Sequence, residues 1–375
     1  GRANALREFL TTAETPNKFD QKELKEVFDL CLSCKACASE CPSNVDVATL
    51  KTEFLYQYQE ANGYPLRGKL FAYNTKFNKL GSKVSGLTNA IYDSKFLGGL
   101  IKKSAGVAKE RSMPKVYSFD FDKYLQLFKN KHITTKKNVV LYIDEFTKYL
   151  DIDLGKDAIE VLTKLGYTME LYYAESGRTY ISKGFLKQAK KLALENIVKL
   201  KEYSDKGIPV IGLEPSALLT FRDEYKRFSS DKTTTNAIAL NSFLIEEFLA
   251  AEIEKGELTP DHFTKNIKKV KIHGHCHQKA LSNQKVTFDI LNLPKNYEVS
   301  IITSGCCGMA GSFGYEKEHY DVSMQIGELK LFPAVRKSPE DTIISANGTS
   351  CRHQIYDGTK RRAKHPITIL KEALI

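Results

Sequence analysis

The 375-residue sequence predicts an α/β fold, in which a helical N-terminal domain precedes a two-repeat α/β domain with parallel sheets. Three observations predict this fold. Residues up to about 110 carry apolar side chains at the three- and four-residue spacing of amphipathic helices. From Asn138 onward, short apolar, β-branched runs alternate with helical segments, the order typical of parallel sheets covered by helices. Two units of this second region also resemble each other, which indicates an internal repeat.

The helical region is expected to form a domain over residues 1–110. Its amphipathic segments are residues 3–10, 21–30 and 47–60. Residues 112–121 contain Met113-Pro114 and alternating aromatic side chains, a pattern typical of extended chain. We therefore predict a linker over residues 111–137.

The α/β region is expected to consist of two copies of one unit. In the first copy, a strand leads into Glu175-Ser176-Gly177 and a later strand ends at Glu214-Pro215-Ser216-Ala217. In the second copy, Cys306-Cys307-Gly308 and Gly348-Thr349-Ser350-Cys351 occupy these positions. The expected strands are residues 139–142, 169–173, 210–213, 270–272, 299–302 and 342–345. The predicted boundaries are residues 138–265 for a first repeat with a degenerate cysteine site and 266–375 for a second repeat with an intact site.

Composition and missing motifs exclude several classes of function. The net charge is +11, but the basic residues are scattered and accompany neither a helix-turn-helix pattern nor an aromatic platform for single strands. No run approaches the roughly 18 apolar residues of a membrane span, and the N-terminus lacks the order of a secretory signal. There is no phosphate-binding glycine loop, dinucleotide fingerprint or Ser-His-Asp arrangement. We therefore expect a cytoplasmic protein that binds no nucleic acid, and we predict no catalytic residue in this chain.

Four of the eight cysteines lie in one short run. Cys31, Cys34, Cys37 and Cys41, followed by Pro42, have the spacing C-x2-C-x2-C-x3-C-P, the ligand run of ferredoxin-type [4Fe-4S] clusters. Two-residue gaps let a tight loop direct three thiolates at three irons, whereas zinc sites usually combine two separated cysteine pairs. We therefore predict that the N-terminal domain is ferredoxin-like and that these four cysteines bind a [4Fe-4S] cluster.

The fourth cysteine of the run, Cys41, is expected to serve a different cluster. In two-cluster proteins of this type, the fourth cysteine of each run ligates the other cluster. Residues 1–9 resemble the stretch that follows the first cluster run in flavin and iron-sulfur fusion oxidoreductases of the D-lactate dehydrogenase/glycolate oxidase type. Because Gly1 also precedes an expected helix without a cap, we expect that the sequence was cut from a longer chain whose upstream part holds the partner run.

The other four cysteines are predicted to form a second metal site. Cys276, Cys306, Cys307 and Cys351 each follow an expected strand. The carboxyl ends of neighbouring parallel strands meet at one edge of a sheet, where open α/β sheets bind their ligands. A helix expected directly after Cys307 would add its positive end, which favours thiolate over thiol.

The residue types leave the chemistry of the second site open. An adjacent cysteine pair between glycines favours an iron-sulfur cluster, while zinc, thiol-disulfide chemistry and simple burial of reduced cysteines remain alternatives. His273, His275 and His277 alternate, so an extended strand would place them on one face and Cys276 on the other. These histidines and His353 are candidates for hydrogen-bond donors to the metal ligands, proton carriers or a quinone contact, with ordinary buried histidine as the alternative.

The second site also resembles a known cysteine-rich domain. Residues 273–281, 306–314 and 347–354 match the CCG domain of the heterodisulfide reductases, the anaerobic glycerol-3-phosphate dehydrogenase iron-sulfur protein and lactate-utilisation proteins. The match to the fused lactate/glycolate type extends over essentially the whole chain. Some family members have a further cysteine where this chain has Gln354, and this departure argues against a five-cysteine cluster.

The resemblance implies an electron-transfer role within an oxidoreductase. An FAD-binding domain or subunit, which alone would carry FAD, would oxidise a 2-hydroxyacid such as lactate or glycolate. This chain would relay single electrons from the reduced flavin to a quinone or another acceptor. The alternatives are a zinc-holding interaction module that docks on a flavoprotein and a thiol-disulfide redox sensor at Cys306-Cys307. A peripheral contact with the inner membrane face through residues 96–107 is also considered, although packing of this segment on its own domain is the favoured interpretation.

Overall fold

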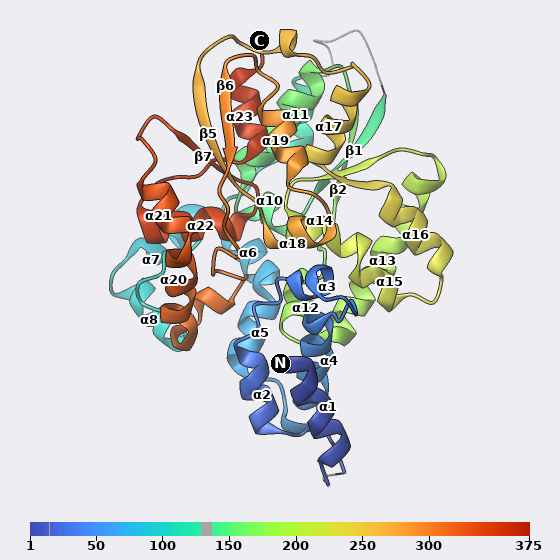
Figure 1. Cartoon of the computed structure of the whole chain (residues 1–375), viewed down its shortest axis with the longest axis vertical. Coiled ribbons are helices and arrows are strands. Elements are labelled where there is room, and N and C mark those ends of the chain that lie inside the picture. Colours follow the sequence, from blue (N-terminus) through green and yellow to red (C-terminus); the bar gives the residue numbers. More distant parts are fainter. Residues whose placement is uncertain (15, 129–136) are drawn as a thin grey trace.

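The computed structural model describes residues 1–14, 16–128 and 137–375, so residues 129–136 of the predicted linker lie outside the described residues. Helices form the N-terminal part, and two parallel sheets with their covering helices form the rest (Figure 1). The predicted α/β fold with parallel sheets is confirmed. The exact domain boundaries remain a prediction.

Short helices build the N-terminal part of the chain. The sequence predicted three of them, α1, α2 and α4, which pack together around Leu6, Leu24, Phe28 and Phe54. Asp46 caps α4 by accepting a hydrogen bond from the Thr49 amide. The helices are α1 (Arg2–Thr12), α2 (Lys22–Asp29), α3 (Ala36–Glu40), α4 (Val47–Asn62), α5 (Leu66–Ala72), α6 (Asn74–Ser82), α7 (Ser85–Asp93), α8 (Leu97–Ser104) and, within the predicted linker, α9 (Phe121–Gln126).

The two sheets share one topology. The first has the strand order β2-β1-β3-β4 and the second β6-β5-β7, and all pairs are parallel. In both sheets the first strand of the unit lies between the second and the third, as the predicted repeat requires. The strands are β1 (Asn138–Ile143), β2 (Thr168–Tyr173), β3 (Val210–Gly212), β4 (Ser242–Leu244), β5 (Lys268–His273), β6 (Tyr297–Ile301) and β7 (Ile343–Ala346).

Helices from both units lie between the two sheets and join the repeats (Figure 1). Helices α11 (Ile152–Lys164) and α17 (Ile245–Glu254) follow strands of the first sheet. They contact α23 (Pro366–Ala373) and α19 (Lys285–Leu291), respectively, of the second unit. One core runs from Leu141 and Ile143 of β1, through these helices, to Val270 and Ile272 of β5. Each repeat therefore helps to cover an apolar face of the other.

The remaining helices surround this layered body. They are α10 (Glu145–Tyr149), α11 (Ile152–Lys164), α12 (Arg178–Ser182), α13 (Leu186–Asp205), α14 (Pro215–Arg222), α15 (Glu224–Phe228), α16 (Lys232–Leu240), α17 (Ile245–Glu254), α18 (Cys276–Leu281), α19 (Lys285–Leu291), α20 (Tyr320–Leu329), α21 (Leu331–Arg336), α22 (Thr349–Thr359) and α23 (Pro366–Ala373), with short 3-10 turns η1 (Pro260–His262), η2 (Phe313–Tyr315) and η3 (Lys317–His319). Within the part of the chain that is described, no helix combines the length and the apolar character needed to cross a membrane.

The first repeat carries the N-terminal helices. Tyr180, Ile181 and Phe185, from α12 and the turn after it, form a small core with Ala72 at the end of α5. The Thr179 hydroxyl donates a hydrogen bond of 2.9 Å to the Ala72 carbonyl. The helical part is therefore fixed below the carboxyl ends of the strands (Figure 1).

Candidate metal centres

The four cysteines of the second predicted site lie at the carboxyl edge of the second sheet. Cys276 is the first residue of α18, beyond β5. Cys306 and Cys307 follow β6, and Cys351 lies in the first turn of α22, beyond β7. Because β5 pairs in parallel with both β6 and β7, all four residues reach the same edge.

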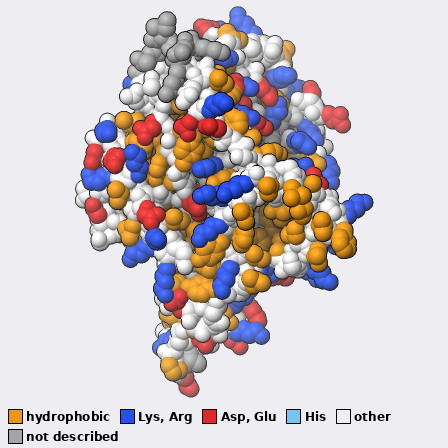
Figure 2. All heavy atoms as spheres, turned by 180° about the vertical axis from the view of Figure 1, so that it is seen from behind, with side chains coloured by type: hydrophobic (Ala, Val, Ile, Leu, Met, Phe, Trp, Pro, Cys, Tyr) orange, Lys and Arg blue, Asp and Glu red, His pale blue; other side chains and the backbone are white. Residues whose placement is uncertain are grey.

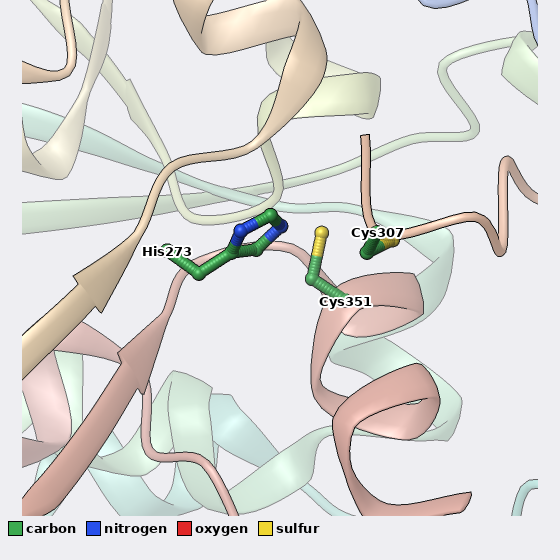
Figure 3. Close-up of side chains that lie close together, drawn as sticks. All are labelled: His273, Cys307 and Cys351. Carbon is green, nitrogen blue, oxygen red and sulfur yellow. The ribbon is translucent and has the colours of Figure 1, made fainter. Parts of the chain in front are cut away.

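Three buried side chains meet most closely at this edge. Ligand atoms of His273, Cys307 and Cys351 all lie within 4.8 Å of one another (Figure 3). His273 Nδ1 lies 2.8 Å from the Ser304 hydroxyl, whereas its buried Nε2 has no hydrogen-bond partner among the described residues. A buried imidazole nitrogen without a partner fits a place where a further group binds.

The thiols of this site influence one another's protonation. Hydrogen bonds from Cys276 and Cys307 lower the pKa of Cys306 well below its ordinary value. A hydrogen bond from Cys307, together with the nearby His273, lowers the pKa of Cys351 in the same way. Thiolates are the form that binds metal, and a set of cysteine sulfurs beside an imidazole suits an iron-sulfur cluster or zinc. The donor set alone does not choose between these two.

No helix begins directly after Cys307, so this part of the prediction was wrong. Gly308 follows with a φ of 96°, where a Cβ atom would lie 2.1 Å from the Ser323 carbonyl oxygen. The chain therefore turns away in a loop before η2. Helix N-termini are nevertheless present, because Cys276 and Cys351 lie in the first turns of α18 and α22.

The three alternating histidines do not lie on one face of a strand, which corrects a second expectation. Strand β5 ends at His273, and the backbone is helical from Cys276 onward. His275 caps α18, because its Nδ1 accepts a hydrogen bond of 3.2 Å from the His277 amide. His277 reaches toward the N-terminal cysteine run, where its Nε2 lies 3.0 Å from the Ser33 carbonyl oxygen.

Gln354, at the position of the further cysteine in some similar proteins, belongs to a buried polar network. Its Oε1 accepts a hydrogen bond of 2.6 Å from Arg111, and its Nε2 donates one of 3.0 Å to the Ser323 carbonyl. Arg111 is itself fully buried and pairs with Asp357 at 3.2 Å. His353 lies outside the closely spaced group of three, and burial lowers its pKa. Neither position adds a donor to that group.

Left-handed backbone on both sides of Cys34 bends the N-terminal cysteine run. Ser33 has a φ of 51° and Lys35 a φ of 63°, conformations that non-glycine residues adopt only rarely. Burial raises the pKa of Cys34, and the nearby thiols of Cys31 and Cys37 raise it further. Three of the four predicted ligands therefore lie close together.

The fourth cysteine of the run differs from Cys34 in its surroundings. Cys41 is partly exposed, and its pKa is lowered by the backbone amides of Val45, Ser43 and Asn44. The described neighbours that shift its pKa are thus backbone groups rather than other cysteines. This difference suits the expectation that Cys41 serves another cluster.

The N-terminal cysteine run lies directly against the second site. Helix α3 packs on α18, and the contact between His277 and Ser33 joins residues that are 244 positions apart in the sequence. Besides burial, the proximity of Cys306 raises the pKa of Cys34. The two groups of cysteines therefore form one continuous region of the molecule, which sequence spacing could not reveal.

Lys35 fixes the cysteine run to the first repeat, and the sequence analysis did not single it out. This side chain is 2% exposed and forms ion pairs with Glu224 at 3.0 Å and with Asp223. Glu224 also pairs with Arg178 at 2.5 Å, in the first turn of α12. The only signal in the sequence was a lysine between two cysteines, since its partners lie far along the chain.

The first repeat retains the shape of the cysteine site without its thiols. Gly177 has a φ of 83°, close to that of Gly308 at the equivalent position. Ser176 stands where Cys307 does, and its hydroxyl donates a hydrogen bond of 2.6 Å to Glu145. Burial raises the pKa of Glu145 to about 7. No described residue of this copy offers a thiol, so it lacks the ligands of the second copy.

A hollow of about 550 Å³ opens beside Cys31. The Lys51 ammonium lies there and donates a hydrogen bond of 2.6 Å to the Cys31 carbonyl. Burial lowers the pKa of Lys51 to about 8. Glu316, which comes from the loop after Cys306-Cys307, lies on the same hollow.

The chain is similar to larger dehydrogenases of known name. It is 27% identical to the D-2-hydroxyglutarate dehydrogenase of Escherichia coli K12 over 362 residues, which make up 94% of this chain and 35% of the relative. It is 27% identical to that of Pseudomonas putida over 365 residues, which make up 92% of this chain and 34% of the relative. The chain thus spans about a third of the length of these relatives. No model of a protein family matches it.

A shorter protein is matched over most of its own length. The chain is 28% identical to the C subunit of the anaerobic glycerol-3-phosphate dehydrogenase of Escherichia coli K12, over 338 residues that make up 89% of this chain and 83% of that relative. Lactate utilization protein A of Anoxybacillus flavithermus is 22% identical over 241 residues, which make up 62% of this chain and 96% of that protein. The resemblance to 2-hydroxyacid dehydrogenases and to the anaerobic glycerol-3-phosphate dehydrogenase is confirmed.

Proposed function

We propose that this chain, a relative of 2-hydroxyacid dehydrogenases and of one subunit of anaerobic glycerol-3-phosphate dehydrogenase, is the iron-sulfur electron-transfer module of a flavin-linked oxidoreductase. An FAD-binding domain or partner subunit oxidises a 2-hydroxyacid, and electrons leave this chain one at a time for a quinone or another acceptor. Cys31, Cys34 and Cys37 hold one [4Fe-4S] cluster, and Cys41 reaches toward a neighbouring one. Cys276, Cys306, Cys307 and Cys351 hold the group at the second site.

One observation carries this proposal, namely that the two cysteine groups lie side by side. Cys34 and Cys306 are close enough for one to raise the pKa of the other, and His277 joins α18 to the loop at Ser33. Iron-sulfur clusters, when bound, accept and donate single electrons. A zinc-holding module has no need for a second cysteine group at this place, and zinc itself undergoes no redox change.

The protein's own residues set the surroundings of both sites. Burial of Cys307 and Cys351 excludes water from the second site, and His273 offers an unpartnered nitrogen toward it. The Val47 amide donates a hydrogen bond of 3.3 Å to the sulfur of Cys37. Amide donors to sulfur and burial are the means by which proteins adjust the reduction potential of such sites.

Metal analysis of the protein made anaerobically from its complete coding sequence tests the proposal. We expect several irons per chain with an equivalent amount of acid-labile sulfide. A Cys351→Ser variant should lose the iron of the second site and keep that of the N-terminal run. Ser350→Ala, a change one residue away in the same helical turn, serves as the matched control and should retain the full iron content.

Two results would contradict the proposal. A single zinc without sulfide would point to an interaction module, and a metal-free protein with a reversible Cys306-Cys307 disulfide would point to a thiol redox sensor. If Cys351→Ser and Ser350→Ala have equal iron contents, the second site is not built from these cysteines.

A further inference from the structure

Helices α6 to α8 expose an apolar face that no described part of the chain covers. Its members are large side chains that are between 51% and 80% exposed. They are Phe77, Leu80, Val84, Leu87, Phe96 and Leu100, and we refer to them as the α6–α8 face. Figure 2 shows hydrophobic side chains gathered on this side of the molecule, with Lys and Arg side chains along them. Contiguous exposed apolar surface of this kind usually marks a site of interaction.

Helical spacing places a basic stripe beside the apolar one. On α6 and the turn after it, Phe77, Leu80 and Val84 recur every three or four residues. Lys79 and Lys83 lie one residue before Leu80 and Val84, about 100° around the helix. The two stripes therefore run side by side along one surface.

Positive charge predominates around the face. Lys79, Lys83, Lys95 and Lys103 are exposed, and none of them forms an ion pair with any residue that the structure describes. The one acidic residue between positions 66 and 104 is Asp93, and it pairs with Lys115 at 2.9 Å. The face is thus apolar at its centre and positive at its border, which matches a surface that is apolar inside and negative outside.

The face is separate from the two hollows near the N-terminal cysteine run. None of its six side chains lines the hollow beside Cys31 or the smaller one between α4 and α12. Gly98 allows α8 to lie close on α7, because a Cβ atom there would be 2.6 Å from the Tyr92 carbonyl oxygen. Segment 96–107 packs on α7 of its own domain and buries Val107, as the sequence interpretation favoured, while Phe96 and Leu100 stay exposed.

We propose that the α6–α8 face is a peripheral membrane-binding surface that docks on a bilayer of anionic phospholipids. The apolar side chains enter the boundary between headgroups and acyl chains, and the lysines contact the negative headgroups. Short helices lying in the interface accomplish this without any membrane-spanning helix. The inference goes beyond the proposed electron relay and does not depend on it.

Sedimentation with lipid vesicles tests this inference. The protein from the complete coding sequence is mixed with vesicles of phosphatidylcholine containing an equal part of phosphatidylglycerol, or with vesicles of pure phosphatidylcholine. We expect binding to the anionic vesicles that weakens with added salt, and much weaker binding to the neutral ones. Removing two charges in Lys79→Gln/Lys83→Gln should weaken anionic binding about thirty-fold.

Matched variants separate the face from general stickiness. Phe96→Ser/Leu100→Ser should weaken binding at least about ten-fold, whereas Leu240→Ser/Leu329→Ser, which change equally exposed leucines on α16 and α20, should not. Lys206→Gln/Lys337→Gln, which removes two charges away from the face, is the control for charge and should not weaken binding to anionic vesicles. The inference is overturned if the protein binds neither vesicle. It is also overturned if the face variants bind anionic vesicles as tightly as the unaltered protein does. That result would overturn it even if the same variants failed to bind a partner protein.

Discussion

A single buried lysine decides how the N-terminal cysteine run sits on the rest of the chain. Lys35 lies among Asp46 at 3.7 Å, Glu224 at 3.0 Å and Asp223, and it is almost fully buried. Glu224 is one of the few buried acids whose pKa is lowered: burial opposes this, but Arg178 and Lys35 outweigh it. Removing the lysine would leave these three carboxylates with Arg178 and Arg227 as their cations among the described residues.

We predict that Lys35→Met lowers the free energy of unfolding by about 3 kcal/mol, because it breaks a buried ion pair on one side only. Lys35→Arg should retain most of the stability. The measurement is urea unfolding followed by circular dichroism, with the exposed Lys79→Met as the control. Equal stabilities of Lys35→Met and Lys79→Met would show that the ion-pair group is dispensable.

Glu246 is the opposite case, a buried acid without a good partner. Neither carboxylate oxygen has a well-formed hydrogen bond among the described residues, and His365 Nε2 lies 3.8 Å away. Burial raises the pKa of Glu246 to about 8, although Asn347 acts against this. Below the ordinary value of 4.5 the group is protonated in both folded and unfolded chain, so it has no effect on stability there. As the pH rises from 4.5 toward about 8, the Glu246 carboxyl ionises in the unfolded chain but stays protonated in the folded protein. Ionisation therefore stabilises the unfolded state relative to the folded state over this range.

We therefore predict that Glu246→Gln raises the free energy of unfolding by about 3 kcal/mol near neutral pH and changes it little near pH 4. Unfolding curves at a series of pH values measure the difference. Glu254→Gln, an exposed change on the same helix, should show no such pH dependence. A stabilisation that is the same at both pH values would contradict the assigned cause.

At the scale of elements, the loop after Cys306-Cys307 connects all three parts of the molecule through Glu316. Its carboxylate pairs with Lys183 of the first repeat and lies 3.0 Å from His319 and 3.9 Å from Arg67 of α5. Burial raises the pKa of Glu316, but His319, Lys183 and Arg67 together lower it to about 2. The stabilisation is therefore present above the ordinary pKa of 4.5 and is lost as the pH falls through about 2.

We predict that Glu316→Gln removes about 3 kcal/mol of stability near neutral pH, and that the variant and the unaltered protein converge as the pH approaches 2. Acid titration followed by circular dichroism measures this difference. The control is Glu318→Gln, because Glu318 pairs with the same Arg67 but is about half exposed. If Glu316→Gln and Glu318→Gln lose equal stability, the ion pairs of Glu316 do not stabilise the protein more than the exposed ion pair between Glu318 and Arg67.

The elements that the sequence predicted well are those whose signal is local. Strands β1, β2, β5, β6 and β7 are short β-branched runs, and the spacing of Cys31, Cys34 and Cys37 is itself the ligand pattern. The prediction of a mostly helical region over residues 1–110 covers α6 and α7, but the sequence did not show that their apolar side chains Phe77, Leu80 and Leu87 would face solvent. The sequence did not predict strand β4, which has only three residues.

The contacts that the sequence could not predict are those between distant segments. Lys35 meets Asp223 across 188 positions, and His277 meets Ser33 across 244. Nothing in the composition of either segment signals its partner. The predicted helix after Cys307 failed for a local reason, since Gly308 needs a left-handed backbone.

At the scale of the whole molecule, the two repeats differ in what they contact. The first repeat lacks the thiols and binds the N-terminal part of the chain instead. The first copy holds Lys35 and packs on Ala72, whereas the second copy holds the four cysteines. The duplicated sheet thus supplies one surface that seats the N-terminal run and another that builds a site beside it. Their closeness is what the proposed relay requires.

Electron paramagnetic resonance of the reduced protein, made anaerobically from its complete coding sequence, tests the relay most directly. We predict iron-sulfur signals that are broadened by magnetic interaction, because Cys34 and Cys306 lie at adjoining sites. In Cys351→Ser the signal of the N-terminal cluster should remain, and it should lose the part of its broadening that comes from the second site. A signal that is identical in the unaltered protein and in Cys351→Ser would contradict the account.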